Sequence, residues 1–228
     1  MLQNVKELDL GEITLKKMVN NQNKWTIIAF ASLIFGILYK LSGAISYKNG
    51  VILTLLDFEE KIPLIPSTIW IYIVLYPIYL IWSLTTFKDE NNMNKLLYSF
   101  LLLTLISCAI FISFPLNYPR EYYPLLFSET ISHKLLQYVR LIDKPSNCFP
   151  SLHVGLCFLF AFIHKNESKK RYVISLLISF SIAISTLTTK QHYFYDLVGG
   201  FILSFTIVTL MNKVSFAESI SLDNFYRE

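Results

Sequence analysis

The sequence predicts an all-α fold: an integral membrane bundle of six transmembrane helices in a single domain. Two observations predict it. Apolar residues make up 54% of the 228 residues and charged residues only 16%, whereas soluble domains contain about 25% charged residues. Six windows are also long and apolar enough to cross a bilayer, which takes about 20 residues in a helix. The net charge of +4 is too small to predict a nucleic-acid partner.

The six windows carry almost no charge. The first contains Lys40, the sixth contains Asp196, and the other four contain no charged residue. The helical part of the fourth window is expected to begin near Pro150. In chain order the windows are 25–47, 68–87, 96–114, the stretch between Lys144 and Lys165, 172–189 and 192–212. We expect a cytoplasmic N-terminal segment 1–24, a membrane domain 25–214 and a cytoplasmic tail 215–228.

The loop charges predict the orientation, because lysine and arginine favour the cytoplasmic side. With the N-terminus inside, twelve of these residues fall in inner segments and seven in outer segments. The short inner loop 164–171 contributes most to this bias. Both chain ends are therefore expected in the cytoplasm.

The outer segment 125–142 has the pattern of a helix lying on the membrane surface. Its apolar residues Ile131, Leu135, Val139 and Ile142 recur at helical spacing, with polar residues between them. Such a helix could cover a site or simply cap the bundle.

Three polar clusters fall on one face of this topology. They are 114–120, which ends in Arg120; 147–153, with Ser151 and His153; and 189–196, with Lys190, His192 and Asp196. The end of the third span, the start of the fourth and the turn from the fifth to the sixth all lie on the outer side. Ionisable residues at the edge of a span are energetically costly and are usually functional. The three clusters therefore predict a functional site on the non-cytoplasmic face.

The residue types within these clusters suit phosphate chemistry. His192 and Asp196 are four residues apart and share one helix face, so the carboxylate can fix the imidazole tautomer and leave a nucleophilic or basic nitrogen. Pro150 and Ser151 open a helix whose free N–H groups can bind an anion. Arg120 and Lys190 add positive charge.

Other interpretations remain open for each residue. His192 with Asp196 could be a hydrogen bond within the membrane, Ser151 a helix cap, Arg120 an interface anchor and Lys190 an ordinary loop lysine. His153, His192 and Asp196 could form a zinc set, although nearby cations and the lack of a compact metal motif oppose it. A proton-coupled membrane transporter is the non-enzyme alternative, opposed by the lack of an internal repeat.

These residues resemble the phosphatidic acid phosphatase type 2 superfamily over roughly residues 55–212. Its third motif ends in His, three residues and Asp, as at His192 and Asp196, and its Pro-Ser-Gly-His motif corresponds to residues 150–153 with Leu152 in place of glycine. Its first motif survives only in Arg120, with Ser113 at the lysine position, and Thr186 stands at the arginine of the third motif. The motifs Pro-Arg, Pro-Ser-Leu-His and Lys-Gln-His-Tyr followed by Asp resemble most those of the inositol phosphorylceramide synthase branch.

The resemblance implies a membrane lipid phosphatase or phosphotransferase that needs no metal and no cofactor. His192 would attack phosphorus to form a phosphohistidine, Asp196 would orient it, and His153 would protonate the leaving oxygen. Arg120, Ser151 and Lys190 would bind the substrate phosphate. The implied partners are the lipid bilayer, a lipid phosphate ester or pyrophosphate as substrate, and water or an alcohol as acceptor; a head-group transferase of inositol phosphorylceramide synthase or sphingomyelin synthase type is the alternative.

Overall fold

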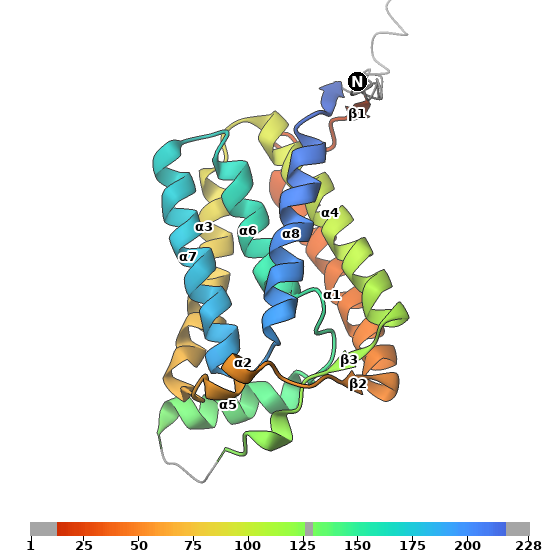
Figure 1. The fold of residues 1–228 in the computed structure, drawn as a ribbon. Coiled ribbons are helices and arrows are strands. Elements are labelled where there is room, and N and C mark those ends of the chain that lie inside the picture. The colour runs from red at the N-terminus through yellow and green to blue at the C-terminus, as the bar shows by residue number, and fades with distance from the viewer. Residues whose placement is uncertain (1–12, 126–129, 218–228) are drawn as a thin grey trace, which may run out of the picture.

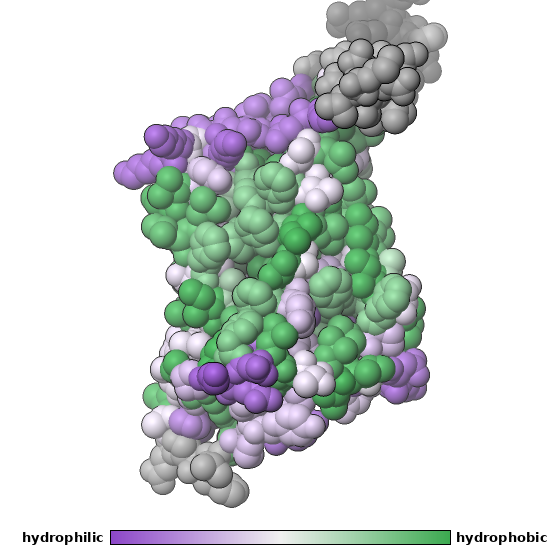
Figure 2. Space-filling view, in the orientation of Figure 1, coloured by the Kyte–Doolittle hydropathy of each residue, from purple (hydrophilic) through white to green (hydrophobic). Residues whose placement is uncertain are grey.

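The computed structural model describes residues 13–125 and 130–217 and is an all-α membrane bundle. Its helices run side by side between two polar ends (Figure 1). The bundle helices are α1 (Lys24–Asn49), α3 (Tyr76–Thr86), α4 (Glu90–Ser113), α6 (Leu152–His164), α7 (Lys169–Thr188) and α8 (Phe194–Met211). Figure 2 shows a broad apolar band around the middle of the bundle, with polar residues gathered toward both ends. The predicted fold class is therefore confirmed.

The fourth predicted span differs from expectation, because its helix is short. Five segments of the described chain are long and apolar enough to cross a membrane, whereas α6 has only 13 residues, which is about 20 Å at 1.5 Å per residue. The chain before α6 is not helical, and its residues Asn147, Cys148 and Ser151 are buried. Non-helical backbone at membrane depth is tolerated where protein covers it.

Helix α6 is the centre of the bundle. It packs against α3, α4, α7 and α8, and all its residues except His153 and Phe162 are buried. A helix that is apolar on every side belongs in such a position. The start of α6 is thereby held firmly within the protein.

The second predicted span begins irregularly. The short 3-10 helix η1 (Pro66–Thr68) is followed by the π-helical turn η2 (Ile71–Leu75) and then by α3. Pro77 has no N–H and its ring would collide with the carbonyl of Ile73 in a regular α-helix. A proline inside a helix is expected to distort it, and the distortion here is a widened turn, a feature common near functional sites.

The first and last strands of the described chain pair at one end of the bundle. Strand β1 (Thr14–Lys16) pairs in parallel with β4 (Ser215–Ala217), and Figure 1 shows both beyond the same ends of the helices. The side chain of Asn94 on α4 accepts hydrogen bonds from the backbone N–H groups of Met18 and Val19 at 2.6 and 2.9 Å. This arrangement requires an even number of membrane crossings.

A layer of short elements covers the opposite end of the bundle (Figure 1). It contains α2 (Asp57–Lys61), the strands β2 (Val51–Ile52) and β3 (Leu116–Asn117), the 3-10 helix η3 (Arg120–Tyr122) and the helix α5 (Ile131–Ile142). Helix α5 lies across the ends of the bundle helices, as expected of a surface helix; residues 126–129 of that prediction lie outside the described residues. Its buried face agrees with the predicted one only in part: Val139 and Leu135 of the predicted stripe pack with Leu136 against Ile69 and Tyr72, while Ile131 and Ile142 are exposed.

Candidate active site

His192 lies just before α8 and is braced by a carboxylate one turn along that helix. Its Nδ1 is 3.0 Å from Oδ2 of Asp196, and the same oxygen accepts the backbone N–H of Tyr193 at 2.9 Å. Both side chains are buried. Because an ionised carboxylate only accepts hydrogen bonds, Nδ1 carries the proton and Nε2 keeps its lone pair.

His153 faces His192 from the first turn of α6. The two ring centroids are 6.4 Å apart, so both imidazoles can contact one tetrahedral phosphate. Tyr72 of the widened turn and Tyr76 at the start of α3 support the His153 ring: their ring centroids lie 4.8 and 4.9 Å away, and the Tyr72 hydroxyl is 3.5 Å from Nδ1. The pattern around Pro77 predicts a kink but gives no hint of these contacts.

The start of α6 is fixed against α8 by backbone contact. The N–H of Ser151 donates to the carbonyl of Asp196 at 2.9 Å. A Cβ at Gly200 would lie 2.5 Å from the Ser151 carbonyl oxygen, so only glycine permits this approach. Ser204 adds a 2.6 Å hydrogen bond to the carbonyl of Gly155. Small residues of this kind let membrane helices pack closely, and here they set the spacing of the two histidines.

Ser151 is the N-cap of α6. Its hydroxyl oxygen accepts the backbone N–H of Val154 at 3.4 Å, and the residue is fully buried. The structure therefore supports the helix-cap interpretation, while the contact of Ser151 with phosphate stays a prediction.

Arg120 is held beside the histidine pair. Its guanidinium donates to the carbonyl of Asp143 and to the side-chain oxygen of Gln191, the neighbour of His192. Its Nε is buried without a hydrogen-bond partner among the described residues. One side of this guanidinium thus remains available to an anion.

Arg140 on α5 is a second guanidinium at this site. It donates to the carbonyl of Tyr123 at 2.7 Å and to that of Thr189 at 3.3 Å, and its Nε also lacks a partner among the described residues. Burial, and then the positive charge of Arg120, lowers the pKa of Arg140 to about 10. Within the described chain no carboxylate lies within 4 Å of either arginine.

Arg140 was missed by the sequence analysis, although a signal was present. It is four residues after Leu136, which is fully buried, so the two share a helix face. A charged residue on the buried stripe of an amphipathic helix indicates a buried anion partner or ligand. The predicted stripe was shifted in phase, which put Arg140 on the solvent side.

Lys190 links the loop before α8 to α2. Its Nζ donates to the carbonyl of Glu59 at 3.0 Å and lies 4.2 Å from the centroid of the Tyr123 ring. Burial lowers its pKa. The carboxylate of Glu59 reinforces this link by accepting the N–H of Phe194 at 2.6 Å. Lys190 therefore braces the loop, and its contact with phosphate stays a prediction.

The alternative zinc site formed by His153, His192 and Asp196 is not supported by the geometry of the described residues. Within residues 13–125 and 130–217 there is no group of three histidine, cysteine, aspartate or glutamate side chains arranged to hold one metal ion. His153 and His192 face each other across a gap instead of converging with Asp196 on one point.

A sequence profile of the PAP2 superfamily matches residues 58–210. The chain belongs to the PAP2 superfamily. The matched region contains both histidines, Asp196 and the two arginines, and membership supports a phosphatase-type or phosphotransferase-type enzyme in the membrane. Searches of curated proteins and of solved structures gave no significant match.

Proposed function

We propose that the chain is a membrane phosphatase or phosphotransferase that acts on a lipid phosphate ester or pyrophosphate through a phosphohistidine on His192. The observation that carries the proposal is the facing pair His153 and His192, 6.4 Å apart, with His192 oriented by Asp196. Two guanidinium groups with unpartnered Nε atoms stand beside this pair.

The first half-reaction uses the two imidazoles in different protonation states. The Nε2 lone pair of His192 forms the N–P bond while the P–O bond to the leaving group breaks. Protonated His153 gives its proton to the leaving oxygen. Asp196 stabilises the positive charge that forms on His192, as a buried carboxylate does for a catalytic imidazole.

The second half-reaction returns the enzyme to its starting state. Neutral His153 takes the proton of water or of an alcohol, whose oxygen forms a new P–O bond as the N–P bond breaks. Arg120, Arg140 and the free N–H groups at the start of α6 would hold the other phosphate oxygens, where charge accumulates in the transition state. No step requires a group from outside the chain other than the acceptor.

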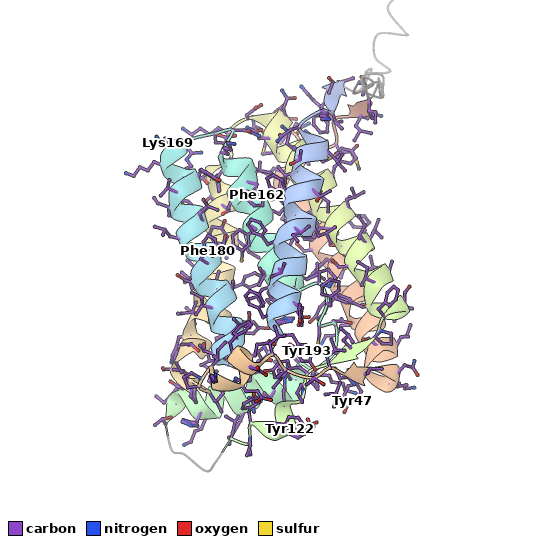
Figure 3. All side chains as sticks on the ribbon, viewed as in Figure 1. Tyr47, Tyr122, Phe162, Lys169, Phe180 and Tyr193 are labelled. Atoms are coloured by element: carbon purple, nitrogen blue, oxygen red, sulfur yellow. The ribbon has the colours of Figure 1, made fainter. Side chains whose placement is uncertain are left out.

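The position of the site favours a lipid substrate. Tyr193, the neighbour of His192, lies between the bundle helices and the layer formed by α2 and α5, at one end of the molecule (Figure 3). A phosphate carried by a membrane lipid sits at this depth. The loop charges predict that this end is on the non-cytoplasmic face, which we include in the proposal.

The proposal is tested by trapping the intermediate. Purified protein in mixed micelles is given phosphatidic acid labelled with ³²P, and the protein is assayed for a phosphoryl group that is stable to base and labile to acid, as a phosphohistidine is. We expect labelling and release of phosphate, both lost in His192→Ala. His133→Ala, which changes a histidine of α5 outside the pair, is the matched control and should retain both. Undiminished turnover in His192→Ala would refute the proposed nucleophile.

A further inference from the structure

A pocket of about 200 Å³ lies between α1 and the chain that follows α5. Nothing in the reaction described above uses it. Its walls include Tyr39, Lys40 and Gly43 of α1, and Asp143, Lys144 and Asn147 of the following chain.

Asp143 is the wall shared by this pocket and the phosphate site. Its carbonyl accepts a hydrogen bond from the guanidinium of Arg120. Burial raises the pKa of its carboxyl, while the charges of Arg120, His192 and Lys40 and a hydrogen bond from Tyr39 act in the opposite direction. Asp143 therefore connects the lining of the pocket to Arg120 of the phosphate site, and its carboxyl is close enough to His192 to be affected by its charge.

The inner wall of the pocket offers hydrogen-bond acceptors. Asn147 is only 3% exposed, and its Nδ2 donates to the carbonyl of Tyr39 at 2.9 Å. That bond fixes the orientation of the amide and leaves Oδ1 without a partner among the described residues. Because a buried polar atom is normally paired, Oδ1 and the Asp143 carboxylate mark a place for hydroxyl donors.

The charges of the lining narrow the class of ligand. The Asp143 carboxylate repels a second anion, and the ammonium groups of Lys40 and Lys144 at the exposed rim repel a cation such as choline. A neutral hydroxyl group is compatible with both the carboxylate and the ammonium groups, since it donates to a carboxylate or amide oxygen and accepts from an ammonium group.

We propose that this pocket binds a neutral, polyhydroxylated alcohol as phosphoryl acceptor, which makes the enzyme a transferase as well as a hydrolase. This inference rests on the proposed function. One hydroxyl of the bound alcohol loses its proton to His153 as its oxygen forms a bond to phosphorus, and the N–P bond to His192 breaks. The products are the phosphorylated alcohol and free enzyme.

The test compares acceptors in the ³²P assay described above. The substrate is ³²P-labelled phosphatidic acid, and the acceptors are glycerol, sorbitol, choline and glycerol 3-phosphate at equal concentration. The measured quantity is the ratio of phosphorylated acceptor to free phosphate. We expect transfer to glycerol and sorbitol, with at least about tenfold less to choline and glycerol 3-phosphate, the loss expected when one charge contact turns repulsive.

Two variants link the ratio to the pocket. Lys40→Gln and Asp143→Ala should each lower the ratio for sorbitol by about tenfold, as expected for loss of one charge-assisted hydrogen bond. Lys48→Gln, at an exposed lysine two turns along α1 and outside the pocket, is the matched control and should keep the ratio.

The outcomes separate this inference from the proposed function. If the wild-type protein forms no phosphohistidine, the proposed function fails. If it forms one that water alone removes, or if choline captures the phosphoryl group as well as sorbitol does, the proposed function stands and the acceptor pocket is wrong. Unchanged ratios in both Lys40→Gln and Asp143→Ala would also overturn it.

Discussion

At the scale of single residues, the site depends on which nitrogen of His192 carries the proton. The carboxylate of Asp196 fixes it on Nδ1 through the 3.0 Å contact. Asp196→Asn offers an amide in place of the carboxylate, and its N–H would face Nδ1 and drive the proton to Nε2. We expect the rate of phosphohistidine formation to fall about a thousandfold or more.

The measurement for Asp196→Asn is a single-turnover assay of the ³²P-labelled intermediate. Elution of the variant as a single species like wild type serves as the folding control, because Asp196 also accepts the N–H of Tyr193. A loss of less than tenfold would mean that the tautomer of His192 is not set by this carboxylate.

The arginine pair gives a second prediction at this scale. Arg140→Lys keeps the charge but loses the planar group that binds two phosphate oxygens at once. We expect kcat/KM to fall by about 10- to 100-fold, with weaker competitive inhibition by inorganic phosphate. Lys134→Ala changes an exposed cation of the same helix and should leave both quantities unchanged; equal losses in the two variants would contradict phosphate contact by Arg140.

Spacing along the chain predicted the core of the site but not its surroundings. His192 and Asp196 are four residues apart and their contact is local, although it is made across the start of α8, with His192 just before the helix and not on the predicted helix face. Arg140, Gln191 and Tyr72 reach the site through tertiary contacts of a surface helix, a loop and a widened turn. No local pattern specifies such contacts, apart from the phase of the buried stripe of α5.

At the scale of elements, the distance between the histidines depends on how closely α6 approaches α8. Gly200→Ala would place a Cβ 2.5 Å from the Ser151 carbonyl oxygen and 3.1 Å from the Gly155 backbone nitrogen. Neither backbone atom can move without shifting the start of α6. We expect lower thermal stability and a loss of activity of at least about tenfold, since small displacements of catalytic groups are sufficient for that.

Gly36→Ala provides the control for this prediction. Gly36 lies in α1 with no atom within 4 Å of an added Cβ. Alanine is favoured over glycine inside a helix by about 1 kcal/mol, so this variant should be as stable as wild type or more so. Activity of Gly200→Ala equal to that of Gly36→Ala would show that the α6–α8 contact does not set the site.

At the scale of elements, hydropathy does not distinguish a buried helix from a buried irregular segment. An apolar window reports burial or lipid contact and not backbone conformation, and much of the irregular chain before α6 is buried like the helix itself. The window therefore predicted the span but not the short helix within it. In the second span, Pro77 predicted a distortion, and the neighbouring turns determined that it became a π-helical turn.

At the scale of the whole molecule, the pairing of β1 with β4 places the first and last described elements at the end of the bundle opposite the site. The short inner loop with Lys165, Lys169, Lys170 and Arg171 lies at the same end as the chain termini. The structure thus gives the relative arrangement of the two faces, and the loop charges only predict which face is cytoplasmic.

Cysteine labelling in intact cells tests the orientation. Figure 3 labels Tyr122 and Lys169 at opposite ends of the molecule, and both are exposed. The three native cysteines, Cys108, Cys148 and Cys157, are buried, so the wild-type protein should react little with a membrane-impermeant maleimide. We expect Tyr122→Cys to be labelled in intact cells and Lys169→Cys only after permeabilisation. Labelling in the reverse order would put the site in the cytoplasm, where the acceptor pocket would meet the soluble polyols of the cell interior instead of those outside the membrane.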